Sequence, residues 1–150
     1  MPKKKKRLFA RKKKPSSRPK NITFNLVEAL VRDNKGRLLL LKRSRENSFF
    51  IGKWQLPGGK VERGESPLHA IKREVKEETG CSPIELRQEK YFFFEWRFDG
   101  FDEKIALTVF SCKLKGPLHL CLDHSAHKFF KLSAIKKSSL TPMSKKAIFE

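Results

Sequence analysis

The chain lacks any long apolar run, and this absence bears on where the protein could reside. No stretch of its 150 residues approaches the roughly 18 apolar residues that a membrane-spanning helix needs. The first residues also lack the apolar core of a secretory signal. We therefore expect a cytoplasmic protein without a membrane span, with a nuclear location open if the source is eukaryotic.

Cysteine is scarce as well, and the few cysteines form no familiar metal-binding pattern. Cys81, Cys112 and Cys121 are an odd number, which favours free thiols over disulfides in a reducing compartment. His124 and His127 follow Cys121, but no paired CxxC or HxxxH accompanies them, so a zinc site is disfavoured.

Acidic residues are absent from the first twenty positions, which carry 11 Lys and Arg. The whole chain has a net charge of +19, so 19 − 11 leaves +8 for residues 21–150. A run of like charge with little apolar content cannot offset its ordering entropy by burial. We therefore predict a disordered basic arm over 1–20 and one folded domain over 21–150. The arm either contacts nucleic acids nonspecifically through counterion release or is a solvated tail. The oligomeric state stays open.

The chain after residue 21 predicts several strands separated by turn sequences. Apolar runs at 22–31 and 37–42 flank the turn sequence "DNKG" and are typical of a hairpin. Longer runs at 90–98 and 104–114 flank "DGFDE" and predict a second hairpin with an acidic loop. Shorter strands are expected at 54–57 and 127–132, and a loop at 58–66.

Two helices are expected among these strands. Ser66 can cap a helix over 66–79, and Gly80 is placed to end it. The tail 141–150 begins with Thr and Pro and predicts a short terminal helix. This order of elements indicates an α/β protein, a mixed sheet with helices packed on it.

The first of these helices carries an unusual group of acids for a basic protein. Glu74, Glu77 and Glu78 fall at i, i+3 and i+4, which makes them neighbours on one helix surface. Like charges at this spacing repel by a few tenths of a kcal/mol per pair. A hard divalent cation such as Mg²⁺ would turn that repulsion into ligation, because it prefers oxygen ligands. The helix alone is explained equally well as a solvated face with charge pairs.

The loop before the helix favours the cation. From Gly59 the spacing is five residues to Glu65 and seven more to "REVKEETGC". This pattern resembles the Nudix box over residues 59–81, with only Cys81 standing where an aliphatic residue is usual. The matching positions are Gly59, Glu65, Arg73, Glu74, Glu77, Glu78 and Gly80. The chain is therefore similar to the Nudix hydrolase family.

This resemblance implies a fold and a metal site. The fold would be the Nudix fold, a mixed β-sheet sandwiched between helices (α/β/α). The substrate would be a nucleoside diphosphate linked to another group. Glu74, Glu77 and Glu78, with the carbonyl of Gly58, would ligate Mg²⁺ or Mn²⁺.

The resemblance also implies roles in catalysis. Arg73 would orient Glu74, and Glu65 would support the same network from the loop. In some members the base that activates the attacking water matches Glu74, and in others it is an acid on a separate loop. The candidates outside the box are Asp99, Asp102 and Glu103, each of which could equally be an ordinary turn residue.

The residues around the box bear on the substrate. The sequence "GKWQLPGGKVERGE" resembles the MutT-like branch, whose members hydrolyse nucleoside triphosphates. The chain lacks the Gln-Gly-Gly form of RNA 5′-pyrophosphohydrolases and the Lys-Gly-His form of dinucleoside polyphosphate hydrolases. It carries Trp96 where ADP-ribose hydrolases have a proline. Elimination favours a (deoxy)nucleoside triphosphate, cleaved to the monophosphate and pyrophosphate, with nucleotide-pool sanitation as one possible role.

Two alternatives stay open. The first is an RNA 5′-end pyrophosphohydrolase whose basic arm holds the RNA. The second is a Nudix fold retained as a non-enzymatic RNA-binding module, although such a module has no need for three clustered carboxylates. The aromatic run at 91–98 is expected to lie mostly in the core, with one or two rings touching a base.

Overall fold

The computed structural model describes residues 23–150, so the predicted basic arm at 1–20 lies outside the described residues. In chain order the elements are β1 Thr23–Val31, β2 Leu38–Arg43, β3 Trp54–Gln55, β4 Gly58–Lys60, α1 Pro67–Thr79, β5 Ser82–Phe98, β6 Phe101–Lys115, β7 His124–Phe130, two 3₁₀ turns at Leu132–Ala134 and Lys137–Ser139, and α2 Pro142–Phe149. No helix among residues 23–150 is long and apolar enough to cross a membrane.

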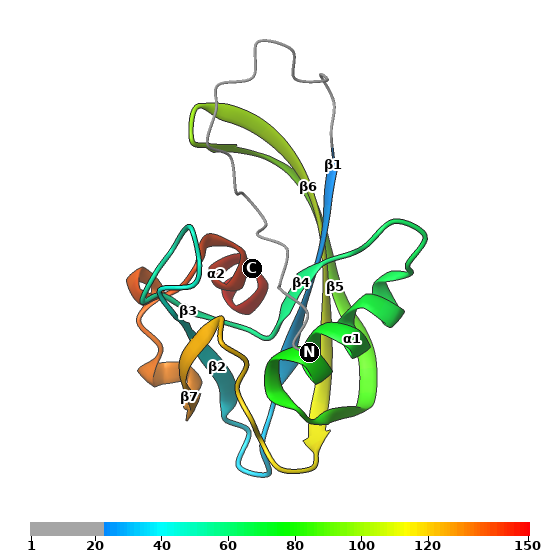
Figure 1. Cartoon of the computed structure of the whole chain (residues 1–150), viewed down its shortest axis with the longest axis vertical. Helices are drawn as coiled ribbons and strands as arrows, with labels where there is room; N and C mark the ends of the chain where they lie inside the picture. Colours follow the sequence, from blue (N-terminus) through cyan, green and yellow to red (C-terminus); the bar gives the residue numbers. More distant parts are fainter. Residues whose placement is uncertain (1–22) are drawn as a thin grey trace.

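The larger sheet has four strands in the order β4-β1-β6-β5. The pair β1–β6 is parallel and the other pairs are antiparallel, so the sheet is mixed. Helices α1 and α2 lie on opposite sides of this sheet (Figure 1). The predicted α/β class is confirmed, with the layering expected of the Nudix fold.

Strand β1 alternates its side chains between two apolar cores. Leu26 and Leu30 face the core that contains Met143 and Ala147 of α2. Val27 and Ala29 face the other core, which includes residues of α1. The sheet is therefore covered on both faces, and polar groups that point inward from β1 must lie in a cavity or find partners.

The first predicted hairpin is wrong in its pairing. Strands β1 and β2 lie in different sheets, because β2 pairs with β3 and β7, and a single bridge joins Arg32 to Leu38. Leu39 and Leu40 are both buried, one in each core, so both faces of β2 are covered. A continuous apolar run predicts such a strand, but it does not identify its partner.

The second hairpin is longer and its turn tighter than predicted. Strands β5 and β6 pair from Ser82 to Phe98, and only Asp99 and Gly100 form the turn, both with positive φ. Asp102 and Glu103 therefore lie in β6 rather than in a loop. Residues 58–60, predicted as loop, form β4 and pair with β1. Two of the three residues of β4 are glycines, so this segment has no alternation of apolar and polar side chains that would predict a strand.

Helix α1 has the predicted bounds and caps. The Ser66 side chain accepts a hydrogen bond from the His69 N–H, and Gly80 ends the helix with φ 72°. Ile71 and Val75 are fully buried against the sheet, whereas Leu68 is 46% exposed because it lies near the solvent-exposed N-terminal end. Glu74, Glu77 and Glu78, here called the acidic stripe, therefore lie along the border of the buried face of the helix, beside β4.

Candidate active site

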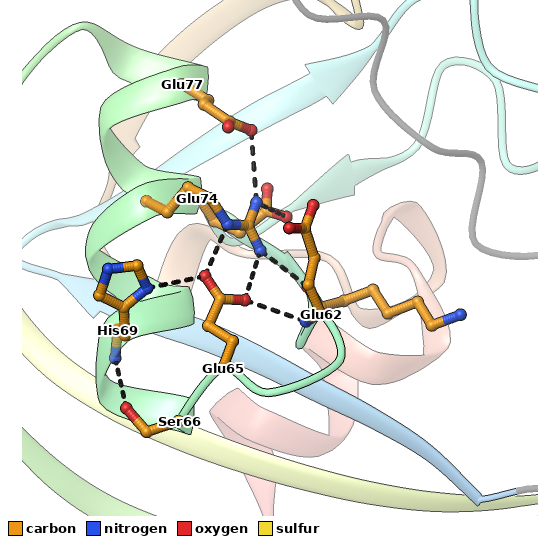
Figure 2. A network of polar contacts seen from close by, with 8 residues as sticks. Glu62, Glu65, Ser66, His69, Glu74 and Glu77 are labelled. Carbon is orange, nitrogen blue, oxygen red and sulfur yellow. Dashed lines mark hydrogen bonds and ion pairs between the residues drawn. The ribbon is translucent and has the colours of Figure 1, made fainter.

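Arg73 connects the loop before α1 to the acidic stripe on α1. Figure 2 shows Glu65 of this loop beside Glu74 and Glu77 of the helix. Its Nε and Nη2 donate to the two carboxylate oxygens of Glu65 at 2.7 and 2.9 Å. Its Nη1 donates to Glu74 Oε1 at 2.9 Å and, more weakly, to Glu77 Oε2 at 3.4 Å. These bonds lower the pKa of Glu65 to about 2 and raise that of Arg73. Arg73 therefore joins Glu65 of the loop to Glu74 and Glu77 of the helix.

Gly59 is required by the position of Glu74. A Cβ at position 59 would lie 2.5 Å from the Glu74 carboxylate, closer than such atoms approach. The Glu74 side chain, 4% exposed, occupies the space that any larger residue at 59 would fill. The motif glycine thus makes room for a carboxylate against the backbone of β4.

Glu78 is fully buried beneath the same segment. Its Oε1 accepts the Gly58 N–H at 3.1 Å, which holds the backbone whose carbonyl was expected to bind metal. Gly58 itself packs tightly on β1, since a Cβ there would lie 2.1 Å from the Val27 carbonyl oxygen. Glu78 and Gly58 therefore form one unit at the edge of the sheet.

The three stripe carboxylates do not converge in this arrangement. Among residues 23–150, no group of three His, Cys, Asp or Glu side chains is placed to hold a metal ion together. Arg73 Nη1 contacts both Glu74 and Glu77, and the Glu77 side chain is 35% exposed. The donors are hard carboxylate and carbonyl oxygens, and the Gly59 backbone accommodates the Glu74 carboxylate. The donor chemistry of these residues therefore fits a divalent cation.

A buried hydrogen-bond chain runs behind Glu78. Arg43 Nη1 donates to Gln55 Oε1 at 2.8 Å, which fixes the Gln55 amide so that its nitrogen faces His124 Nε2 at 2.7 Å. His124 Nε2 therefore accepts, and its Nδ1 carries the hydrogen toward Cys121 Sγ at 3.6 Å. His124 Nε2 also lies 3.4 Å from Glu78 Oε2. These hydrogen-bonded side chains lie next to Glu78, which in turn contacts the Gly58 N–H.

Glu28 is a second buried carboxyl on β1. Its Oε1 accepts a hydrogen bond from Ser144 Oγ at 2.8 Å, and Ser144 Oγ in turn accepts the Leu56 N–H at 2.8 Å. Burial, opposed by the Ser144 bond and reinforced by the charge of Glu78, raises the pKa of Glu28 to about 8. Helix α2 thereby holds both β1 and the segment before β4.

A cavity of about 420 Å³ connects these groups. It is lined by polar residues of α1 and of the loop and strand before it: Lys60, Glu62, Arg73, Glu74 and Glu77. It is also lined by apolar and aromatic side chains: Leu26, Phe49, Phe50, Trp96, Pro142 and Met143. Glu28, Arg43, Gln55 and Asp123 also line it. The cavity thus has both charged side chains and aromatic rings in its lining.

The three candidate acids of the second hairpin do not line this cavity. Asp99 lies in the turn, Asp102 is 70% exposed and pairs with Arg97, and Glu103 is buried in β6. Asp123 lines the cavity instead, from the segment before β7, and becomes the candidate acid outside the box.

The sequence interpretation missed Glu28, Arg43, Gln55 and Asp123, and it considered His124 only as a zinc ligand. One signal was present: Glu28 is the only acid in the otherwise apolar run "LVEALV". A charged residue inside a buried strand is uncommon unless it has a partner or a role. The other residues gave no comparable pattern.

Trp96 is the ring of the predicted aromatic run that lines the cavity. It stacks on Phe98 with ring centroids 4.8 Å apart, and Phe50 from the loop after β2 lies 6.3 Å from Trp96. The Arg43 Nε holds this loop by donating to the Phe49 carbonyl at 2.9 Å. The aromatic rings near the cavity therefore come from two segments that are distant in the sequence, the loop after β2 and strand β5.

Curated relatives resemble the chain over part of its length. An RNA pyrophosphohydrolase from Bartonella henselae is 32% identical over 96 residues, covering 61% of this chain and 54% of the relative. The 8-oxo-dGDP phosphatase NUDT18 from Danio rerio is 36% identical over 74 residues, covering 48% of this chain and 22% of the relative. The chain thus spans about half of the first relative and about a fifth of the second.

Solved structures match more of the fold. A MutT Nudix hydrolase from Burkholderia pseudomallei has a TM-score of 0.74 and 27% identity, covering 85% of this chain and 97% of that chain. A MutT protein from Methanosarcina mazei has a TM-score of 0.70 and 26% identity, with coverages of 87% and 94%. The family model of the NUDIX domain matches residues 25–149, and the chain therefore belongs to the Nudix family.

Proposed function

We propose that the protein is a divalent-metal-dependent pyrophosphohydrolase that cleaves (deoxy)nucleoside triphosphates to the monophosphate and pyrophosphate. The observation that carries this proposal is the cavity, whose lining includes carboxylates of α1 and aromatic rings. A nucleoside triphosphate has the matching polarity, with charged phosphates at one end and a planar base at the other. The volume of about 420 Å³ lies within the range of ligand sites.

Glu74, Glu77 and Glu78, with the Gly58 carbonyl, are proposed to hold Mg²⁺ or Mn²⁺. When bound, the cation would neutralise phosphate charge and make water a better nucleophile. Arg73 and Glu65 hold Glu74 in place, because Glu74 accepts from a guanidinium that Glu65 fixes through two bonds. This makes Glu74 the proposed base, with Asp123 as the alternative acid.

A panel of nucleotides with Mg²⁺, with pyrophosphate, phosphate and nucleoside monophosphate measured as products, tests this function. We expect triphosphates to yield the monophosphate and pyrophosphate. Release of single phosphates, or turnover of only ADP-ribose or dinucleoside polyphosphates, would contradict the substrate assignment. No turnover of any nucleotide would contradict the enzymatic function and favour a binding module.

Hydrolysis at an RNA 5′ end is the second candidate, favoured by the similarity to RNA pyrophosphohydrolases such as that of Bartonella henselae. The basic arm at 1–20 would then retain the RNA through phosphate contacts. The same assay with 5′-triphosphorylated RNA separates the two candidates. A kcat/KM for RNA far above that for free triphosphates would favour the second.

A further inference from the structure

Two aromatic side chains of β5 are exposed to solvent on one face of the larger sheet. Tyr91 and Phe93 are each 59% exposed, and among residues 23–150 they are the only aromatic members of the group of exposed large apolar side chains. Successive residues of a strand point to opposite faces, so these two rings share a face and their Cα atoms are about 7 Å apart. Phe92 and Phe94 point the other way and pack on the core that α2 covers. Tyr91 and Phe93 therefore face away from that core.

Helix α1 covers the face of the two rings only in part. Val27 and Ala29 of β1 are fully buried in the core that includes residues of α1, but Asn25, on the same face of the strand, is exposed. Asn25 pairs in register with Ala106 of β6, and Ala106 pairs with Phe93. Figure 1 shows the turn end of β5 and β6 extending past α1. The two rings therefore lie beside a part of the sheet that α1 does not cover.

The two rings are separate from the candidate active site. Neither Tyr91 nor Phe93 lines the cavity. Trp96 and Leu26 do line it, and both belong to the opposite face of the sheet, since they pack in the core that α2 covers. A ligand on the two rings would therefore leave the cavity free, and its binding is independent of the proposed hydrolysis.

The charged side chains nearest the rings balance one another. Glu95 follows on the same face of β5 and pairs in register with Lys104 of β6. Further along the hairpin, Arg97 forms an exposed ion pair with Asp102 at 3.2 Å. These four residues have no net charge together, so the charge that selects a ligand must come from elsewhere in the chain.

The basic arm supplies that charge at the same end of the sheet. Thr23, the first residue of β1, pairs in register with Lys104, and Lys104 pairs with Glu95 of β5. Neighbouring strands are about 4.8 Å apart, so the point where the arm joins the sheet is about 10 Å from the strand that carries the rings. Residues 1–20 carry 11 Lys and Arg and no acid. A strong positive charge is therefore tethered close to two exposed rings.

We propose that Tyr91 and Phe93 stack on the bases of a single-stranded nucleic acid whose phosphates are held by the basic arm. Exposed aromatic side chains next to positive charge are a common means of binding single strands, because every base has a flat face that can stack. A second copy of the chain is the other occupant that two exposed rings would suit, but a net charge of +19 on each copy opposes self-association. A polyanion is attracted by the same charge.

Fluorescence anisotropy with a labelled oligoadenylate of about ten nucleotides tests this surface, with an abasic strand of the same length as the reference. RNA and DNA forms of the oligoadenylate identify the nucleic acid that is preferred. The native protein should bind the abasic strand about tenfold more weakly, because that strand keeps the phosphates but has no bases to stack. Tyr91→Ala combined with Phe93→Ala should weaken oligoadenylate binding by about tenfold and leave abasic-strand binding unchanged. The dependence of log Kd on log salt should keep its slope, since no phosphate contact is removed.

Three further variants separate stacking from other effects. Tyr91→Phe combined with Phe93→Tyr keeps both rings and should bind as the native protein does. Leu132→Ala removes an apolar side chain of similar exposure, 54%, from a 3₁₀ turn and should leave every Kd unchanged. Deletion of residues 1–20 should weaken binding of both strands and lower the salt slope.

Several results would overturn the inference. One is equal binding of the oligoadenylate and the abasic strand by the native protein, a comparison that requires no variant to fold. Another is an oligoadenylate Kd that the alanine pair at Tyr91 and Phe93 leaves unchanged. Stronger binding after deletion of residues 1–20 would mean that the arm competes for the rings. A native dimer that the alanine pair converts to a monomer, measured by sedimentation, would assign the rings to self-association instead.

Discussion

At the scale of single residues, one guanidinium organises the acidic side of the site. Arg73 donates to Glu65, Glu74 and Glu77, and it also donates to the Lys60 carbonyl at 3.0 Å. Bidentate bonds between arginine and a carboxylate are among the stronger polar interactions and fix both partners in orientation. The loop before α1 and the helix are thereby held as one rigid unit.

The first prediction concerns pH and Glu65. Its pKa falls from an ordinary 4.5 to about 2 in the folded protein, so its pairing with Arg73 stabilises the fold above pH 4.5. That contribution is lost as the pH falls through 2, because the carboxylate must then be protonated. The difference in free energy of unfolding between the native protein and Glu65→Gln should therefore shrink as the pH falls from 4.5 to 2.

Urea denaturation at a series of pH values measures this difference. Glu85→Gln is the matched control, because Glu85 pairs with Lys113 at 3.4 Å while both side chains are well exposed. Its effect should be small at every pH. A Glu65→Gln effect that is constant across the acid range would contradict the role assigned to the Arg73 pair.

The second prediction concerns Gly59. Gly59→Ala would drive a methyl group into the Glu74 carboxylate, which lies 2.5 Å from the position that the new Cβ would take. We expect kcat for triphosphate hydrolysis to fall by about 100-fold, as displacement of a catalytic group by about 1 Å can cause. Gly64→Ala is the control, since nothing lies within 4 Å of the added atom and only its φ of +79° opposes the change. Equal kcat of the two variants would contradict the claim that catalysis depends on the position of the Glu74 carboxylate.

At the scale of elements, helix α2 connects strands that the sequence keeps far apart. Ser144 and Glu28 are 116 positions apart, and Ser144 and Leu56 are 88 apart. The Thr141 N–H also donates to the Trp54 carbonyl at 2.9 Å at the start of the helix. The short C-terminal helix therefore stabilises the segment that leads into β4.

The third prediction follows from these contacts. Ser144→Ala leaves the Leu56 N–H and Glu28 Oε1 without their buried partner, and we expect a loss of about 1–3 kcal/mol in the free energy of unfolding. Lys145→Ala, on the exposed side of the same helix, should change it by less than about 0.5 kcal/mol. Thermal or urea denaturation measures both. Similar small effects would mean that the helix is held by apolar packing alone.

The elements also show what local sequence can and cannot predict. Helix α1 was predictable to within a residue because Ser66, Pro67 and Gly80 act through neighbouring backbone groups. The contacts of Arg73 were predictable because a motif of fixed spacing carries them. The pairing of β2 was not, since both its faces are apolar and nothing local selects its partner.

Residues of the cavity away from the box were beyond local prediction for a related reason. Gln55 and His124 are 69 positions apart and meet only because β3 and β7 both flank β2. Neither residue belongs to a spaced pattern in the sequence. Glu28 was visible only as a lone acid among apolar residues, and its partner Ser144 comes from the last helix.

At the scale of the whole molecule, charge separates the chain into two parts. The first twenty residues carry 11 of the 35 Lys and Arg and none of the 16 acids, whereas the residues that match the Nudix box all lie within 59–81. Small nucleotides should therefore be hydrolysed without the arm, while binding of nucleic acid should depend on it.

The fourth prediction tests this division. Deletion of residues 1–20 should leave kcat/KM for a free triphosphate within about twofold, and it should lower the affinity for RNA at low salt. Steady-state kinetics and filter binding at several salt concentrations measure the two effects. A collapse of triphosphate hydrolysis would place the arm in the active site.

The central claim is that the carboxylates of α1 hold the cation for hydrolysis of a nucleotide anhydride. Its most direct test is kcat for triphosphate hydrolysis by Glu77→Gln with Mg²⁺, alongside the free energy of unfolding of the metal-free protein. Loss of groups that only support metal ligands costs about 10–100-fold, so loss of a ligand should lower kcat by about 100-fold or more. Because Glu77 is partly exposed and bonds Arg73 only at 3.4 Å, stability should change little. Turnover close to that of the native protein, from a variant that folds normally, would contradict the metal site.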